Sequence, residues 1–168
     1  EKTTALYEAV IIGNLEIIKL LLSNNKIDVN MISLVKSKDT IIQSTALGFA
    51  LYSKNIEAIK LLLLHPKIDV NHIVTKTSNA VIKSSILNEA IKSKNIELVN
   101  LFLSHPQIDV NMIFKKFSEA YEVNRNVLSH AVHVNNQEIV KLLLNHPNID
   151  VNIKTVEKNL PGCEASYE

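Results

Sequence analysis

The sequence is poor in the residues on which many enzyme sites and disulfide frameworks depend. It has one cysteine, Cys163, and three glycines in 168 residues. A lone cysteine excludes an intrachain disulfide framework and any multi-cysteine zinc or iron-sulfur site. Three glycines leave no glycine-rich loop for a nucleotide, and no nucleophile elbow, metalloprotease helix or calcium loop occurs. We therefore expect no enzyme, no cofactor and no metal site.

Strong net charge and long apolar runs are also missing. The 18 basic and 17 acidic residues give a net charge of +1, so electrostatics offers no reason to expect nucleic acid as a partner. No apolar run approaches the roughly 18 residues of a membrane-spanning helix, so we expect no direct membrane insertion. With one cysteine and no signal-peptide pattern, we expect a cytoplasmic protein. Because the chain opens without a methionine, we expect it to be a piece of a longer protein.

What the sequence does contain is an internal repeat. Four copies of the motif Ile-Asp-Val-Asn place an aspartate at Asp28, Asp69, Asp109 and Asp150, with spacings of 41, 40 and 41 residues. The alanines Ala9, Ala50, Ala90 and Ala131 keep the same spacings. Two anchors with one period indicate four repeats, at about residues 4–44, 45–84, 85–125 and 126–152.

Each repeat is predicted to hold two short helices. The first helices are expected over residues 4–12, 45–53, 85–93 and 126–134, where leucine and alanine lie three apart on one face. A turn such as Gly13-Asn14 suits left-handed backbone angles and opens the second helix. The second helix has an acidic residue in its first turn, and in three repeats a proline such as Pro66 stops it. The result is a helical hairpin.

A long connection joins each hairpin to the next. The Ile-Asp-Val-Asn motif is extended, and its Asp and Asn suit a turn. Residues 31–44, 72–84 and 112–125 then show two apolar or β-branched runs around a polar middle. This pattern predicts a β-hairpin finger in each connection.

These motifs resemble those of the ankyrin repeat family. The segments Thr4 to Ala9 and Thr45 to Ala50 are similar to the family's TPLHxA opening, and Glu138 to Leu144 is similar to its second helix. The resemblance covers Thr4 to Asn152, but the period exceeds the family's value of about 33 residues. The family's histidine is replaced by Tyr7, Gly48, Asn88 and Ser129, which puts its hydrogen bond between repeats in doubt.

The resemblance implies a mainly α fold, an α-solenoid of four stacked helix-turn-helix ankyrin-like repeats with β-hairpin fingers. First helices would line a concave face, and stacking would supply the core. We expect the array over residues 1–152 and, over 153–168, a C-terminal tail or a truncated next repeat. Cys163 falls in this tail, where we expect an incidental thiol.

Recurring polar residues have structural explanations. His65, His105 and His146 occupy one repeat position, but equivalent residues of stacked units lie roughly 8 to 10 Å apart, too far to share a zinc ion. A histidine is favourable at a helix C-terminus instead. The repeated aspartates are too far apart for an acid/base pair and are interpreted as turn residues.

The candidate binding residues lie where the repeats differ. Variation concentrates at the ends of the first helices, and aromatic residues gather in the third finger. These positions are Ile11, Ile12, Tyr52, Ser53, Lys92, Ser93, Phe114, Phe117, Tyr121 and His133. Two explanations stay open for the helix ends, a binding surface or drift on a solvated face. The aromatic residues are either interface anchors or packing between adjacent hairpins.

We interpret the protein as a non-catalytic interaction module that binds another protein or a peptide through the concave face and the fingers. One alternative is a spacer or scaffold segment of a longer repeat array, suggested by the apolar Ile11 and Ile12 at the first repeat. Another is a regulatory or targeting domain attached to an enzyme. The open ends of a repeat stack also offer a route to self-association.

Overall fold

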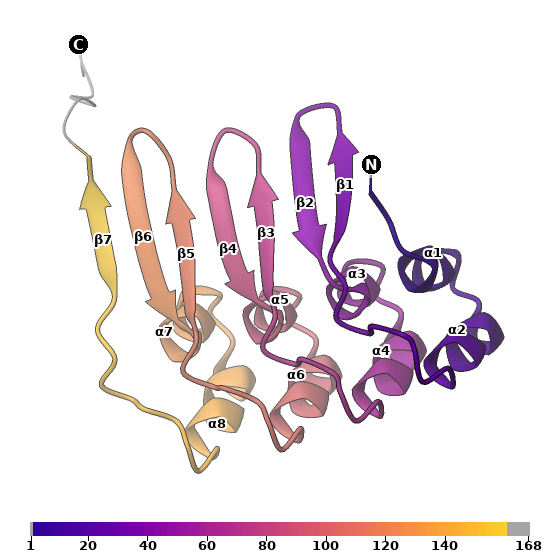
Figure 1. The fold of residues 1–168 in the computed structure, drawn as a ribbon. Coiled ribbons are helices and arrows are strands. Elements are labelled where there is room, and N and C mark those ends of the chain that lie inside the picture. Colours follow the sequence, from indigo (N-terminus) through magenta and orange to yellow (C-terminus); the bar gives the residue numbers. More distant parts are fainter. Residues whose placement is uncertain (1, 161–168) are drawn as a thin grey trace.

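The computed structural model describes residues 2–160, in which two rows of short helices run beside a row of strands (Figure 1). The first row contains α1 (Ala5–Ile12), α3 (Ala46–Tyr52), α5 (Ile86–Lys92) and α7 (Val127–His133). The second row contains α2 (Leu15–Leu22), α4 (Ile56–Leu63), α6 (Ile96–Leu103) and α8 (Gln137–Leu144). Each helix of the first row forms a hairpin with the next helix in the chain. The predicted helical hairpins are therefore confirmed.

Capping residues fix where these helices begin. The Thr4 side chain accepts a hydrogen bond from the Tyr7 N–H at 3.1 Å and so begins α1. In the second row, asparagine caps all four helices, as in α4, where Asn55 Oδ1 accepts from the Ala58 N–H at 3.0 Å. A side-chain cap satisfies a backbone donor that has no partner inside the helix.

The turn between the two helices uses left-handed backbone angles, as the sequence predicts. Its φ values are 77° at Gly13, 56° at Lys54, 57° at Lys94 and 54° at Asn135. Glycine and asparagine adopt this region readily, whereas a lysine there carries a steric cost. Asn14 and its equivalents follow directly as helix caps, so each turn also starts the second helix.

The core lies between the two rows and runs along the whole stack. Leu47, Ala50, Leu87 and Ala90 are each fully buried on the first row, and Phe102 is fully buried on the second. Alanine has no side chain beyond Cβ, so it lets a neighbouring helix approach closely. Because α1 packs on α3, α3 on α5 and α5 on α7, each unit depends on the next for burial.

The Ile-Asp-Val-Asn motif closes a turn and fastens one unit to the next. In all four copies the Asp carboxylate accepts a hydrogen bond from the Asn N–H two residues later, at 2.8 to 3.0 Å. The Asn30 side chain donates to the Lys67 carbonyl oxygen at 2.7 Å and accepts from the Asp69 N–H at 2.8 Å. Asn71 and Asn111 make the same two bonds to the units that follow them. The motif therefore forms an asparagine ladder along the stack.

Removing one rung of this ladder should weaken the stack. We expect Asn71→Ala to lower the free energy of unfolding by about 1 to 2 kcal/mol, because it leaves a carbonyl and an N–H without their partner. Urea unfolding followed by circular dichroism measures the change. Asn152→Ala is the matched control, since the Asn152 side chain makes no hydrogen bond within residues 2–160. Equal losses in both variants would contradict the ladder.

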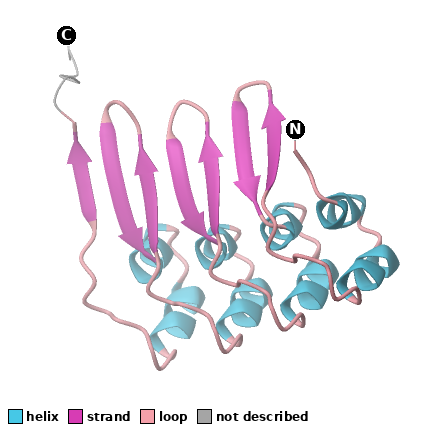
Figure 2. Ribbon diagram, viewed as in Figure 1, coloured by secondary structure: helices cyan, strands magenta, loops and turns pink. Residues whose placement is uncertain are grey.

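The predicted fingers are β-hairpins, and they join into one antiparallel sheet (Figure 2). Within residues 2–160 the sheet has seven strands in chain order. They are β1 (Ser33–Ser37), β2 (Thr40–Ser44), β3 (Ile73–Thr77), β4 (Val81–Ser85), β5 (Ile113–Phe117), β6 (Tyr121–Asn126) and β7 (Val156–Asn159). Neighbouring hairpins pair directly, as Ile42 does with Lys76 and Ile82 with Lys116. The sequence predicted fingers beside helical units but not their union into a sheet.

This union has an energetic reason. An isolated two-stranded hairpin is marginally stable in water, whereas several strands together satisfy each other's backbone groups. β7 adds a strand to β6 from within residues 153–168, the segment expected to be a C-terminal tail or a truncated next repeat. Cys163, also predicted in that tail, lies outside the described residues.

Successive side chains of each strand point to opposite faces of the sheet. Phe114 pairs with Arg125, and Lys116 pairs with Val123. These four residues line a hollow that α5 and α7 also border, and we call this side of the sheet the inner face. Lys115 lies between Phe114 and Lys116 in the strand, so its side chain belongs to the opposite, outer face.

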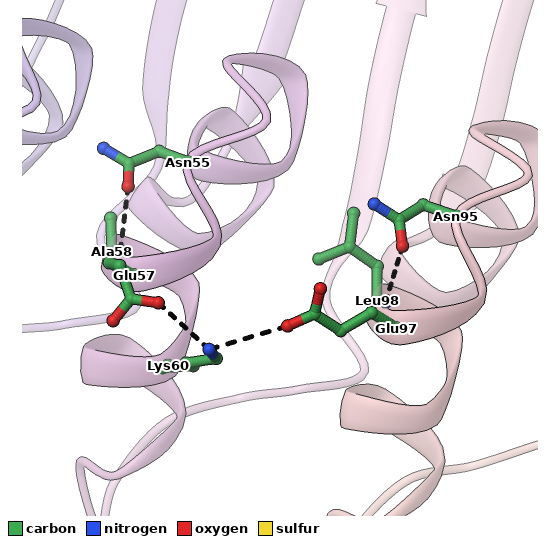
Figure 3. A network of polar contacts seen from close by, with 7 residues as sticks. All are labelled: Asn55, Glu57, Ala58, Lys60, Asn95, Glu97 and Leu98. Carbon is green, nitrogen blue, oxygen red and sulfur yellow. Dashed lines mark hydrogen bonds and ion pairs between the residues drawn. The ribbon is translucent and has the colours of Figure 1, made fainter.

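The second row of helices carries charged contacts on its surface. Lys60 Nζ lies 3.0 Å from Glu57 Oε1 on its own helix and 3.6 Å from Glu97 Oε1 on the next (Figure 3). Both partners are well exposed, so water competes for these ion pairs and they contribute little to stability. This side of the molecule is a solvated back, in contrast to the inner face of the sheet.

Candidate functional site

The candidate site is a groove between the inner face of the sheet and the first row of helices. Its volume is about 440 Å³. Strands β4, β5 and β6 supply one wall, and helices α5 and α7, with the residue after α7, supply the other. The lining residues are Ile82, Lys92, Phe114, Lys116, Tyr121, Val123, Arg125, His130, His133 and Val134. We call this hollow the groove.

The groove combines aromatic and cationic side chains. Lys116 Nζ lies 4.8 Å from the centre of the Tyr121 ring, a cation-π contact. The Arg125 guanidinium donates to Glu157 Oε1 on β7, which holds Arg125 at the wall. Phe114 stacks at a tilt on the His130 ring, with the ring centres 5.3 Å apart. Aromatic and arginine side chains are the types that most often anchor a protein partner.

A second, smaller hollow of about 230 Å³ adjoins the groove at Lys92. It lies between the ends of α3 and α5 and is lined by Leu51, Tyr52, Lys54, Glu89, Lys92 and Ser93. Burial and the negative charge of Glu89 raise the pKa of the Tyr52 hydroxyl, which therefore stays protonated and can donate a hydrogen bond. Lys92 Nζ lies 3.8 Å from Glu89 Oε2. The two hollows share Lys92 as a lining residue.

His130 lies at the base of the groove as a neutral group. Its side chain is 7% exposed, and its Nδ1 lies 2.9 Å from Asn88 Oδ1. Burial, together with the positive charges of Arg125, His133 and Lys92, lowers the pKa of His130 to about 4. The neutral ring donates from Nδ1 to Asn88, whose own amide donates to Ser85 Oγ at 3.1 Å. This chain of hydrogen bonds ties α5 to α7 under the groove.

The contact between Asn88 and His130 has an equivalent earlier in the stack. At the corresponding two positions, Tyr7 of the first unit meets the Phe49 ring of the second edge-on, with centres 4.7 Å apart. The sequence left the hydrogen bond between repeats at this position in doubt. The structure replaces it by an aromatic contact in one place and by a polar contact in another.

The structure brings several of the predicted site residues together and leaves others apart. Lys92, Phe114, Tyr121 and His133 line the groove, and Tyr52, Ser93 and Lys92 line the adjoining hollow. Ser53 is exposed beside Tyr52, where its hydroxyl donates to the Ala50 carbonyl oxygen at 3.1 Å.

Three predicted residues lie away from the groove. Ile11 and Ile12 are exposed at the end of α1, at the other end of the helix row from α7 (Figure 1). Phe117 is three positions from Phe114, so the alternation of the strand places it on the outer face. There it borders a separate hollow with the tip of the neighbouring hairpin. The aromatic cluster predicted in the third finger is therefore divided between two faces.

Sequence reasoning missed His130 and Glu89 as residues of the site. They occupy one repeat position, which holds Glu8, Phe49, Glu89 and His130 in turn. That position varies as strongly as the helix ends from which the candidates were drawn. Comparing the repeats at this position would have found both residues.

The recurring histidines have a local role in the structure. The Nδ1 atoms of His65, His105 and His146 each accept a hydrogen bond, at 3.3 Å, from the backbone N–H two residues later. Among residues 2–160, no group of three or more histidine, cysteine or acidic side chains is placed to hold a metal ion. No helix in this range has the length and apolarity needed to cross a membrane.

Comparisons with known proteins agree with this architecture. A family model described as ankyrin repeats (3 copies) matches residues 1–74 and again residues 73–155. The curated proteins compared with the chain include no match. Among solved structures, the ankyrin repeat protein EF0377 superposes with a TM-score of 0.63 and 22% identity, over 90% of this chain and 65% of that one.

A second solved structure is similar to the same degree. The ankyrin repeat domain of Bcl-3, described as a unique member of the IkappaB protein family, has a TM-score of 0.61 and 21% identity. It is matched over 90% of this chain and 58% of its own length. The chain thus spans about three fifths of each of these structures, and a likeness at this identity concerns the fold alone.

Proposed function

The chain belongs to the ankyrin repeat family, and we propose that it binds a segment of another protein in the groove between the sheet and α5 and α7. Ankyrin repeats are generally protein-protein interaction modules without catalytic activity, and the stacked helix pairs seen here have that architecture. The proposal adds the surface on which this chain would bind.

The observation that carries this proposal is the groove itself. Its aromatic and basic side chains come from four different elements, β5, β6, α5 and α7, and one wall consists of paired strands. Because the strands and helices are already ordered, binding does not have to offset the folding of the receptor surface. The fingers take part through their inner face, since β4, β5 and β6 supply one wall.

Selection of displayed peptides tests this function without a known partner. A random peptide library would be panned against the protein, against the groove variant Lys116→Ala with His133→Ala, and against the outer variant Lys83→Ala with Lys115→Ala. We expect the library to yield peptides that bind the wild type and the outer variant but do not bind the groove variant. Peptides retained equally by all three proteins, or an absence of enriched peptides, would refute the groove as the binding surface.

A second candidate function, as a segment within a longer repeat array, is favoured by apolar side chains on both end units. Ile12 and Leu20 are each 71% exposed at one end, and Val132 is 61% exposed at the other. Terminal repeats that serve as caps normally carry a polar outer face.

Self-association would follow if these ends bind one another. Analytical ultracentrifugation should then show a mass that rises with concentration, and Leu20→Glu with Val132→Glu should remove the rise. A monomer at all concentrations would argue against this route.

A further inference from the structure

The inner face of the sheet alternates basic and apolar side chains from strand to strand. Lys76 on β3 pairs with Ile82 on β4, which pairs with Lys116 on β5, which pairs with Val123 on β6. Paired residues lie on the same face, so these four side chains form one row across two hairpins. We propose that this row selects, as the partner of the groove, an extended acidic segment with a carboxylate at every third residue and apolar side chains between the carboxylates. The proposal rests on the function proposed above.

The charge of the row is not neutralised within the described part of the chain. Arg125 is bonded to Glu157 and Lys92 lies near Glu89, but Lys76 and Lys116 have no acidic partner within residues 2–160. The whole chain has a net charge of only +1, so these two lysines are a local excess. Lys92, Arg125 and His133 add positive charge at the groove itself. An acidic ligand is the complementary partner.

The spacing of the lysines sets the spacing of the carboxylates. Neighbouring strands lie about 4.8 Å apart. Lys76 on β3 and Lys116 on β5 are two strand spacings apart, so their backbones are separated by roughly 10 Å. Three residues of a polyproline II segment span about 9.3 Å, with the first and the fourth side chain on one side. An acidic residue at every third position therefore fits both lysines.

The lysines favour carboxylates in the partner, and the apolar lining of the groove favours apolar side chains. Phe114, Tyr121 and Val123 are each partly exposed at the groove wall. A volume of about 440 Å³ is within the range of roughly 300 to 1,000 Å³ typical of ligand pockets. It accepts a large side chain of the partner, so a segment that is acidic but lacks apolar side chains should bind more weakly.

Fluorescence anisotropy with designed peptides tests the proposal. The probe is a labelled peptide of four Glu-Phe-Ser repeats, compared with Gln-Phe-Ser, Lys-Phe-Ser and Glu-Ser-Ser repeats and with a single-stranded oligouridine. We expect the Glu-Phe-Ser peptide to bind most tightly, with an affinity that falls as salt is added. Stronger binding of the lysine peptide, of the peptide without phenylalanine, or of the oligouridine would overturn the proposal. Failure of every probe to bind would overturn it too.

Neighbouring lysines on the two faces give a matched pair of variants. Lys116→Glu should lower the affinity for the Glu-Phe-Ser peptide roughly tenfold. Lys115→Glu, on the outer face of the same strand, should lower that affinity much less. Lys76→Glu is a second variant of the inner-face row, beside the groove, and circular dichroism checks the fold of each variant. Equal effects at Lys115 and Lys116 would contradict the inner-face row.

The two proposals can fail separately. If peptide selection yields groove-dependent peptides that are not acidic, the binding function stands and the acidic preference is wrong. If no displayed peptide depends on the groove, the binding function itself is wrong.

Discussion

Phe102→Ala should lower the free energy of unfolding by about 3 to 5 kcal/mol, the range for removing a large buried side chain. Phe102 is fully buried in α6 and belongs to the continuous core between the helix rows. Truncation removes apolar contacts and leaves a cavity that the neighbouring helices fill only in part. Urea unfolding followed at a helix-sensitive wavelength measures the loss.

The repeats themselves provide the control for this variant. The equivalent residues Leu62 and Leu143 are also fully buried, so the same helix position accommodates leucine in two other units. Phe102→Leu should therefore cost about 1 kcal/mol, far less than the alanine variant. If the alanine and leucine variants lose the same stability, or if neither loses any, the core does not depend on this position as the structure indicates.

Acid should destabilise the protein through His130 by an amount of comparable size. The pKa of His130 is lowered to about 4, whereas an unfolded histidine has a pKa of about 6.5. Between these values the unfolded chain binds a proton that the folded chain does not, so the free energy of unfolding falls as pH falls from about 6.5 to about 4. The full loss from this group is on the order of 3 kcal/mol.

Other groups also titrate in this range. The test therefore compares how the free energy of unfolding changes with pH in the wild type and in a variant without His130. Urea unfolding between pH 4 and pH 7 would be measured for the wild type and for His130→Asn, whose side-chain amide takes the position of Nδ1 and can donate to Asn88. We expect the stability of the wild type to fall more steeply than that of the variant as pH falls. Parallel curves would mean that His130 is not held neutral.

The sequence was a good guide to the helical stack because the information there is local and repeated. Asn55 caps a helix, Lys54 takes the left-handed turn, and the aspartate of each Ile-Asp-Val-Asn motif closes a turn. Each feature depends on residues within one unit. The recurrence of the same residues at the same spacing along the chain makes each of these predictions stronger.

The sheet was harder to predict because its decisive contacts are not local. Ile42 pairs with Lys76 across a whole unit, and no pattern within either hairpin specifies that partner. The pairing register also determines which face a side chain takes. Phe114 and Phe117 are close in sequence but lie on opposite faces, so grouping them by proximity overlooked the alternation of a strand.

The groove follows from that sheet and could not be read from the helices alone. Lys92 and His133 were found because the helix ends vary, and Phe114 and Tyr121 because aromatics are scarce in this chain. These four residues line one hollow above His130 because β4, β5 and β6 pair with one another. Individual residues were predictable, whereas their union in one groove was not.

Site-specific photocrosslinking tests most directly whether the inner face is the binding surface. A photoreactive phenylalanine would replace Tyr121 on the inner face or Phe117 on the outer face of the same hairpin. Each protein would then be irradiated in an extract of the cells that produce it. We predict a discrete protein adduct at position 121 that is absent at position 117 and is removed by Lys116→Glu. Adducts at 117 alone, or equal adducts at both positions, would contradict the groove as the site where this protein meets its partner.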